Sequence, residues 1–346
     1  MNQATQKLLL AITKSLRAML TACDAWIKSQ EPPKPVPVPA PVPTPSLPPL
    51  ASIAKYNEQM LTKGKAQLGN RDAILGGSTW EGNAWYYDGT RVAYQIADYT
   101  GDKSFAEYAK NPLDVYRPYV LDNGGNVPAW RHFAQGLRMH YERTGDDKSK
   151  QAVQVLVTNS SSPVWKAENL SPESMSRELA YAIDDAIEAG KLGLPTPRLA
   201  EYVGYALGHI DQWFVQEKFV AFKPFMFALT AEALIKYYEA TKDTRILPAL
   251  KLGADWIWAK AWVAADKSFV YELTPGQPLS KGEPDLNLLT APVYGWLYAQ
   301  TGDKSYIEKG DQIFTGGVEG AWLDQGKQFN QSYRWSVDYL KWRGAK

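Results

Sequence analysis

The stretch that decides the fold runs from Trp80 to Tyr108 and reads WEGNAWYYDGTRVAYQIADYTGDKSFAEY. It holds, in order, a polar and aromatic segment, an apolar-striped helix, the turn Thr100-Gly101-Asp102 and the start of a returning helix. In such a turn the glycine ends one helix with a positive φ, and the Asp that follows caps the next helix. The stretch therefore predicts a helical hairpin.

The same turn recurs along the chain. Copies stand at 144–146 and 301–303, with weaker copies at 241–243 and 189–193. Their spacing of about 45 to 60 residues is typical of units that stack or form a ring. We therefore expect a series of helical hairpins rather than one irregular helical domain.

Apolar periodicity between the turns predicts roughly twelve helices and a single strand at 267–273. Paired, with the first helix closing against the last, they predict an all-α fold, an (α/α)6 toroid; an open helical solenoid is the alternative. The expected helices lie at 54–68, 83–99, 104–119, 128–143, 147–158, 173–189, 197–215, 223–240, 244–260, 286–300, 304–315 and 329–342.

Composition excludes some functions and favours another. The net charge of +1 argues against nucleic acid as a partner, and no apolar run is long enough to span a membrane. The 13 Trp and 20 Tyr exceed what a core of this size normally needs. Flat aromatic faces with a polar edge suit the stacking of sugar rings, although these side chains also fill wide helical cores.

Two segments precede the globular part, which we place at 51–346. Residues 1–30 carry apolar side chains at coiled-coil spacing, so we expect a helix that pairs with itself, with an anchoring protein or with a membrane surface. Residues 31–50 alternate proline with other residues and predict an extended proline-rich stalk. The single Cys23 excludes an internal disulfide.

The residues around Cys23 leave a second interpretation open. The run 20–23 resembles a lipoprotein cleavage box, which would make the protein a periplasmic lipoprotein. Lys14 and Arg17 interrupt the apolar stretch that such a signal requires. We therefore prefer the coiled-coil interpretation.

The connections opposite the short turns are longer and rich in Gly, Trp and polar residues. Long loops carry function more often than short ones, so we expect the site where these loops meet, at the N-terminal ends of alternate helices. The loops lie at 70–82, 120–127, 159–172, 216–222, 261–285 and 316–328.

Helical hairpins joined by Thr-Gly-Asp-Lys-Ser turns, with an aromatic loop such as 80–89, resemble the (α/α)-barrel carbohydrate-active enzymes. That group includes unsaturated glucuronyl hydrolases and alginate lyases. The resemblance covers about residues 52 to 346 and implies architecture only. The chain lacks the Asn-His pair of the alginate lyases, so the resemblance assigns no catalytic residue.

For glycoside hydrolysis, two carboxyl groups are needed. Asp88 follows Trp85 by one helical turn and lies on the stripe of Val92 and Ile96, so burial is expected to raise its pKa toward that of a general acid. Glu81 lies nearer the loops and completes the pair. The alternative is that Asp88 is satisfied by Arg91 or a neighbouring loop.

For elimination, a lyase needs a base and a group that neutralises the uronic carboxylate. His132 with Arg131 follows a glycine-rich loop and supplies both, with Tyr333 nearby. A structural histidine is the alternative. We expect the substrate to be bound by Trp80, Trp85, Tyr87, Trp130, Arg177, Glu178, Lys223, Asp285, Tyr333, Arg334 and Trp335.

The sequence holds no phosphate loop, dinucleotide fingerprint or zinc spacing, so we expect no cofactor and no metal. The leading hypothesis is a glycoside hydrolase that cleaves a bacterial surface or extracellular polysaccharide, as a depolymerase attached to a bacteriophage virion or as an extracellular enzyme. The alternatives are a polysaccharide lyase, a non-catalytic carbohydrate-binding or structural appendage, and a helical scaffold that binds protein.

Overall fold

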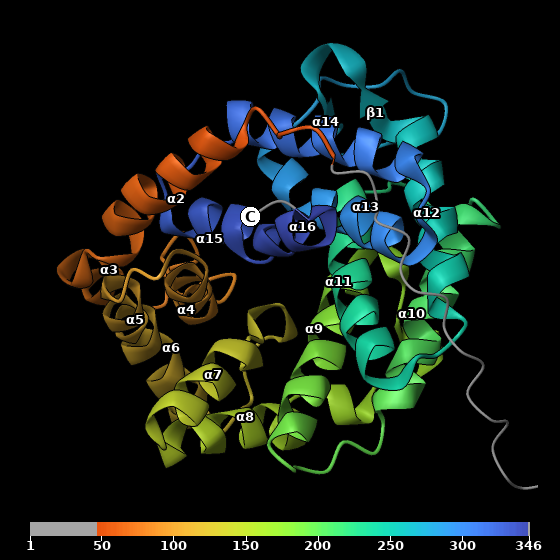
Figure 1. Ribbon diagram of the computed structural model, residues 1–346. Coiled ribbons are helices and arrows are strands. Elements are labelled where there is room, and N and C mark those ends of the chain that lie inside the picture. The colour runs from red at the N-terminus through yellow and green to blue at the C-terminus, as the bar shows by residue number, and fades with distance from the viewer. Residues whose placement is uncertain (1–46, 345–346) are drawn as a thin grey trace, which may run out of the picture. The chain divides into compact units, whose positions relative to one another are not determined.

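The computed structural model describes residues 47–344, which are predominantly helical, and the expected all-α class is confirmed (Figure 1). The predicted helix at 1–30 and the proline-rich stalk as far as residue 46 lie outside the described residues. Leu50 is buried, and Arg343 donates a hydrogen bond to the carbonyl of Pro48. The start of the described chain is therefore fixed against the helical part.

Alternate helices pack on one another in the order of the chain, and we call them the core series. Each packs on the next, and α15 packs on both α13 and α4. The series comprises α4 (Gly89–Thr100), α7 (Ala134–Thr144), α9 (Pro172–Lys191), α11 (Pro224–Thr241), α13 (Asn287–Thr301) and α15 (Gly326–Tyr333), which α16 (Ser336–Arg343) extends.

The middle of the core series is buried on all sides. In α13 every residue from Asn287 to Tyr298 is buried, and α11 is nearly as enclosed. A helix that is apolar all round belongs inside a protein, since no face of it suits water. Charged side chains on these helices therefore need partners inside the fold.

The remaining helices form a flanking series that buries one face each. In α8, Ala152, Val153 and Leu156 face inward while the other side meets solvent. The flanking helices are α2 (Ile53–Leu68), α5 (Ser104–Tyr108) with α6 (Lys110–Asp122), α8 (Asp147–Asn159), α10 (Leu199–Phe214), α12 (Ile246–Ala261) and α14 (Lys304–Gly320).

The recurring turns end the core helices as predicted. Gly101, Gly145 and Gly302 follow α4, α7 and α13 with φ of 76°, 73° and 71°. In the weaker copy Lys242 takes the same left-handed conformation, with φ of 57°. Asp303 then caps α14 by accepting from the Ser305 amide at 2.9 Å. The turn chemistry thus sets where each hairpin reverses.

Several predicted boundaries were wrong. The helix expected from 83 begins at Gly89, because Tyr87 and Asp88 adopt positive φ and cannot continue a helix backward. The helix expected from 128 begins at Ala134, after a 3₁₀ turn over Ala129–Arg131.

Two predicted helices are divided, and one predicted loop contains a helix. The span 104–119 forms α5 and α6, and 329–342 forms α15 and α16. The expected loop at 70–82 contains α3 (Arg71–Gly77). The expected strand is short: β2 (Ser268–Phe269) pairs antiparallel with β1 (Trp262–Val263).

Alanine substitutions at two glycines test the turn chemistry. A Cβ would meet nothing within 4 Å at either Gly302 or Gly204, but only Gly302 has a positive φ. We expect Gly302→Ala to lower the free energy of unfolding by about 1 to 2 kcal/mol, and Gly204→Ala, within α10, to raise it by about 0.5 to 1 kcal/mol. Urea denaturation followed by circular dichroism measures both. Equal effects would contradict the role assigned to the turn.

Candidate functional site

A cavity of about 410 Å³ opens at the N-terminal ends of the core helices, and we call it the charged cavity. The loop before α4, the starts of α9 and α11, the 3₁₀ turn Pro284–Leu286 and α15 all contribute to its wall. It is therefore formed where the long loops were expected to meet. Its lining comprises Tyr86, Tyr87, Arg177, Lys223, Phe225, Met226, Tyr271, Glu283, Asp285, Leu286, Lys327, Gln328 and Gln331.

The first and last helices of the core series are joined beside this cavity. The Asn330 side chain on α15 donates to the carbonyls of Ala84 and Tyr86, at 2.6 and 2.9 Å. The Lys327 amide donates to the carbonyl of Gly82 at 3.2 Å. These bonds fix the loop before α4 against α15, so both sides of the cavity wall are held in place.

Three cations line the charged cavity. Arg177 pairs with Glu178 at 2.6 Å, and Lys223 lies 3.4 Å from Glu272. Lys327 has no carboxylate partner among residues 47–344, and its ammonium lies 5.2 Å from the centre of the Tyr86 ring. The Lys327 ammonium, which has no carboxylate partner among these residues, favours an anionic ligand.

Two carboxylic acids share the same wall. Glu283 is exposed, and its amide donates to the carbonyl of Phe269 at 2.7 Å. Asp285 is half-buried; its carboxylate accepts from the Trp322 amide, and its carbonyl accepts from Gln331 at 2.8 Å. Burial raises the pKa of the Asp285 carboxyl. The two acids thus differ in environment, as the two acids of a hydrolase must.

The tyrosines of the cavity act as hydrogen-bond donors rather than bases. Burial raises the pKa of both Tyr86 and Tyr87 above the ordinary value for tyrosine. Their phenols therefore stay protonated near neutral pH. Tyr86 donates to the carbonyl of Trp130 at 3.2 Å, and its ring packs edge-on against Tyr87.

Asp88 and Glu81 are not brought together. Asp88 caps α4 and is 5% exposed, with its carboxylate accepting from the amides of Gly136 at 2.8 Å and Arg91 at 3.2 Å. Burial raises its pKa to about 6. Glu81 is exposed and pairs with Arg131 at 3.0 Å. Neither lines the charged cavity. The Asp88 carboxylate is engaged by Arg91, which the alternative interpretation named, and by Gly136 on α7.

His132 is buried and bonded at both ring nitrogens. Its Nδ1 lies 2.9 Å from the Asp185 carboxylate, and its Nε2 lies 3.2 Å from the carbonyl of Val127. Arg131 stacks on Trp130, with its guanidinium carbon 4.4 Å from the ring centre. Trp130 contacts Tyr86 and Arg177 of the charged cavity, but His132 itself does not line that cavity.

The other expected binding residues divide into two groups. Tyr87, Arg177, Lys223 and Asp285 line the charged cavity, while Trp80 lines a neighbouring cavity. Trp85, Tyr333, Arg334 and Trp335 are buried in the core, Glu178 is buried beside Arg177, and Trp130 is partly covered by arginines.

Specific contacts explain the buried positions. The Trp85 ring stacks on Tyr116 with centres 5.6 Å apart. The Tyr333 hydroxyl donates to the carbonyl of Tyr56 at 3.1 Å, and the Trp335 indole donates to the carbonyl of Leu289 at 2.9 Å. Many aromatic residues of this sequence therefore pack the core instead of facing a ligand.

A buried charge network lies among the core helices, and sequence reasoning missed most of it. Glu232 on α11 lies 2.6 Å from Arg91 on α4 and 2.7 Å from Arg334 after α15. Lys236 contacts Glu232 at 3.4 Å and pairs with Asp184 on α9. The sequence did carry one signal for this network. Glu232 is the one charged residue in the apolar span 224–235, and Lys236 follows it by four residues.

The ionised state of Glu232 is set by its partners. Burial disfavours the charged carboxylate, but Arg334 and Arg91 outweigh it and hold the pKa of Glu232 well below its usual range. The carboxylate therefore stays ionised and joins several helices of the core series.

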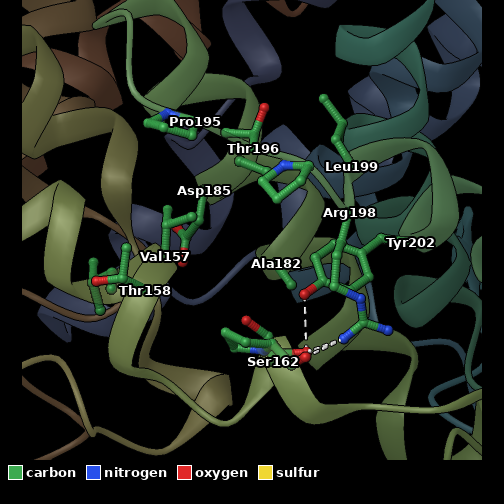
Figure 2. Close-up of a pocket in the computed structure, with 14 residues that line it drawn as sticks. Val157, Thr158, Ser162, Ala182, Asp185, Pro195, Thr196, Arg198, Leu199 and Tyr202 are labelled. Carbon is green, nitrogen blue, oxygen red and sulfur yellow. Dashed lines mark hydrogen bonds between the residues drawn. The ribbon is translucent and has the colours of Figure 1, made fainter.

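A second cavity, of about 290 Å³, lies among α8, α9 and α10 and is mainly apolar (Figure 2). Arg198 donates to the carbonyl of Ser162 at 3.1 Å, and the Tyr202 hydroxyl donates to the same carbonyl at 2.9 Å. Asp185 lies at its edge, where it also holds His132. Its polar groups are thus already engaged within the protein.

Comparison of the chain with protein-family models and with curated proteins gave no match. Within residues 47–344, no helix is both long and apolar enough to cross a membrane. The same residues include no group of three or more His, Cys, Asp or Glu placed to hold a metal ion. The function is therefore argued from the geometry of the site.

The raised pKa of Asp88 predicts a measurable pH dependence. Between its ordinary value of 3.8 and its folded value of about 6, Asp88 holds a proton in the folded state that it loses on unfolding. Stability relative to Asp88→Asn should therefore fall by about 1 kcal/mol per pH unit across that window, and stay constant above it. Urea denaturation of both proteins between pH 4 and 7 measures the difference. A flat difference would contradict the raised pKa.

Removal of the buried carboxylate tests the charge network. Glu232→Gln leaves Arg91 buried without an ionic partner and Arg334 with only the more distant Asp184, at 3.8 Å. We expect a loss of about 3 to 5 kcal/mol in the free energy of unfolding. The control is Glu239→Gln on the same helix, where the exposed pair with Lys242 predicts a loss below about 1 kcal/mol. Urea denaturation compares them. A loss at position 232 no larger than the control would remove the network from its structural role.

Proposed function

We propose that the protein is a glycoside hydrolase that cleaves an acidic polysaccharide in the charged cavity. The observation that carries the proposal is the composition of that wall: three cations, three tyrosines and two carboxylic acids converge on one cavity. The cations suit the carboxylates of a sugar chain, the aromatic faces suit its rings, and the acids suit its glycosidic bond.

In this proposal Asp285 is the general acid and Glu283 the second carboxylate. The raised pKa of Asp285 supports a protonated carboxyl that donates to the leaving glycosidic oxygen. Glu283, which is exposed on the same wall, either activates water or attacks the sugar carbon. The glycosidic C–O bond breaks as Asp285 gives its proton to the leaving oxygen. If Glu283 is the base, it takes a proton from the water whose hydroxide bonds to the sugar carbon, and exchange with solvent restores both carboxyl groups. If Glu283 attacks, water then breaks the ester bond that Glu283 has formed and returns a proton to Asp285. Asp88 and Glu81, which neither line this cavity nor face each other, are replaced in that role.

The cations orient the substrate in the same proposal. Arg177 at the start of α9 and Lys223 before α11 would contact sugar carboxylates from one side, and Lys327 on α15 from another. The ionic contacts would hold the chain in register while the acids act on the bond between two sugars. The three cations would thus contribute by positioning the substrate and not by transferring protons.

We also propose that the core series closes into an (α/α)6 toroid with the charged cavity at its mouth. The contact of α15 with both α13 and α4 supports closure over an open solenoid. The expected attachment to a virion through residues 1–30, or another extracellular placement, remains part of the proposal and concerns residues outside the described range. A surface polysaccharide as substrate is consistent with either placement.

Elimination is the second candidate, because Arg177 or Lys223 would neutralise a uronic carboxylate as a lyase requires. The charged cavity offers Tyr86, Tyr87 and Tyr271 as candidates for the base, and the raised pKa values of Tyr86 and Tyr87 oppose proton removal near neutral pH. His132 is bonded to Asp185 and does not line the cavity. We therefore favour hydrolysis.

An activity assay on the full chain tests the proposal. We expect acidic bacterial polysaccharides to yield new reducing ends without the absorbance of unsaturated products. Asp285→Asn keeps a side-chain oxygen for the Trp322 amide and removes the acid, so we expect the rate to fall by about 10² or more.

The control is Asp72→Asn, an exposed acid on α3 that should leave the rate unchanged. Unsaturated products would replace hydrolysis with elimination. Binding without either product would support a non-catalytic carbohydrate-binding appendage, and a panel without binding would overturn the carbohydrate function altogether.

A further inference from the structure

A third cavity, of about 450 Å³, is lined by two tryptophans, and we call it the indole cavity. Trp80 precedes the loop before α4, and Trp322 lies between α14 and α15; their side chains are 61% and 50% exposed. No other tryptophan in the described part of the chain is as exposed. Apolar indole surface that stays exposed to water is unfavourable for stability, and exposed apolar surfaces of this kind mark binding sites.

The indole of Trp80 is held in place by its surroundings. It lies against Gly82, where a Cβ would overlap the ring, and near the side-chain amide of Gln325. The glycine therefore gives the indole room beside the cavity.

The rest of the indole cavity is polar but carries no cation. Asn83 is fully engaged with the backbone, donating to the carbonyls of Ile74 and Ser78 and accepting from the Ala84 amide. Asp324, the single acid on the wall, is paired with Lys63. The amides of Gln67 and Gln325 make no side-chain hydrogen bond to residues 47–344 and are half-buried at the wall. Neutral donors and acceptors beside indole rings match an uncharged sugar, with its hydroxyls and its apolar ring face.

The two cavities share their walls. Gln325 and Gly326 line the indole cavity, and the next two residues of α15 line the charged cavity. The amide of Trp322 donates to the carboxylate of Asp285, which ties the indole segment to the acid of the charged cavity. The two cavities are therefore neighbours along α15.

We propose that the indole cavity is a second subsite for the same glycan chain, which takes an uncharged sugar residue next to the acidic residue held in the charged cavity. This inference rests on the proposed function and narrows its substrate to a heteropolymer in which acidic and neutral sugars are neighbours. A polymer of acidic residues alone fills only the charged cavity, and a neutral polymer fills only the indole cavity.

Binding by the full chain to immobilised bacterial polysaccharides tests the subsite. The set comprises acidic homopolymers, neutral homopolymers and heteropolymers that contain both kinds of sugar. We expect the heteropolymers to bind most tightly. Trp80→Ala and Trp322→Ala should each weaken that binding about tenfold, equivalent to about 1.4 kcal/mol, and leave acidic homopolymer binding unchanged.

Two further variants make the result specific. Trp80→Phe keeps an aromatic face and should retain most of the affinity, whereas Leu252→Ala removes an exposed apolar side chain on α12 and should change nothing. Both tryptophans are exposed, so we expect each variant to fold, and circular dichroism checks this.

The outcomes separate the two proposals. If Arg177→Ala weakens acidic glycan binding while both tryptophan variants bind every polymer as the wild type does, the subsite is overturned and the proposed function stands. If the wild type binds no polymer of any kind, the proposed function fails and the subsite fails with it. Equal loss of binding to acidic homopolymers and heteropolymers would show that the indoles serve the charged cavity and would overturn a separate neutral subsite.

Discussion

The carboxylate of Glu232 is the contact on which the arrangement of the core helices depends. It meets Arg91 from α4 and Arg334 from the end of α15, so the first and last helices of the core series share one buried anion with α11. Each cation would be costly in an apolar interior without it, and the carboxylate would be costly without them. The three charges therefore specify which helices meet, and they exclude packings that separate them. The charged cavity forms at the N-terminal ends of the helices joined in this way.

The hairpin order was predictable because its signal is local. A glycine with positive φ after Thr100 or Thr301 needs no tertiary contact to end a helix, and apolar periodicity marks what lies between. The start of α4 was not predictable from periodicity, since Tyr87 and Asp88 satisfy a helical pattern while their backbone is left-handed. Their conformation is fixed by long-range bonds, such as that from Gly136 to Asp88, which the sequence does not display.

Loop length indicated the ends of the helices at which the charged cavity lies, and Arg177, Lys223 and Asp285 line it. Acid residues were ranked by their neighbours in sequence, which favoured Asp88, yet the Asp88 carboxylate is buried and engaged by the amides of Arg91 and the distant Gly136. Glu283 and Lys327 were missed because each lies in a loop or helix start whose direction depends on distant partners. The sequence also did not show which tryptophans are buried: Trp80 is exposed, whereas Trp85, five residues later, is buried.

The bonds from Asn330 to the carbonyls of Ala84 and Tyr86 have a consequence for the order of events during synthesis. The two partners are separated by 246 and 244 residues, so almost the whole chain must leave the ribosome before they can meet. Earlier hairpins can form as they emerge, because their contacts are close in sequence. The wall that carries Tyr86, Tyr87 and Lys327 therefore forms only after the earlier hairpins have emerged.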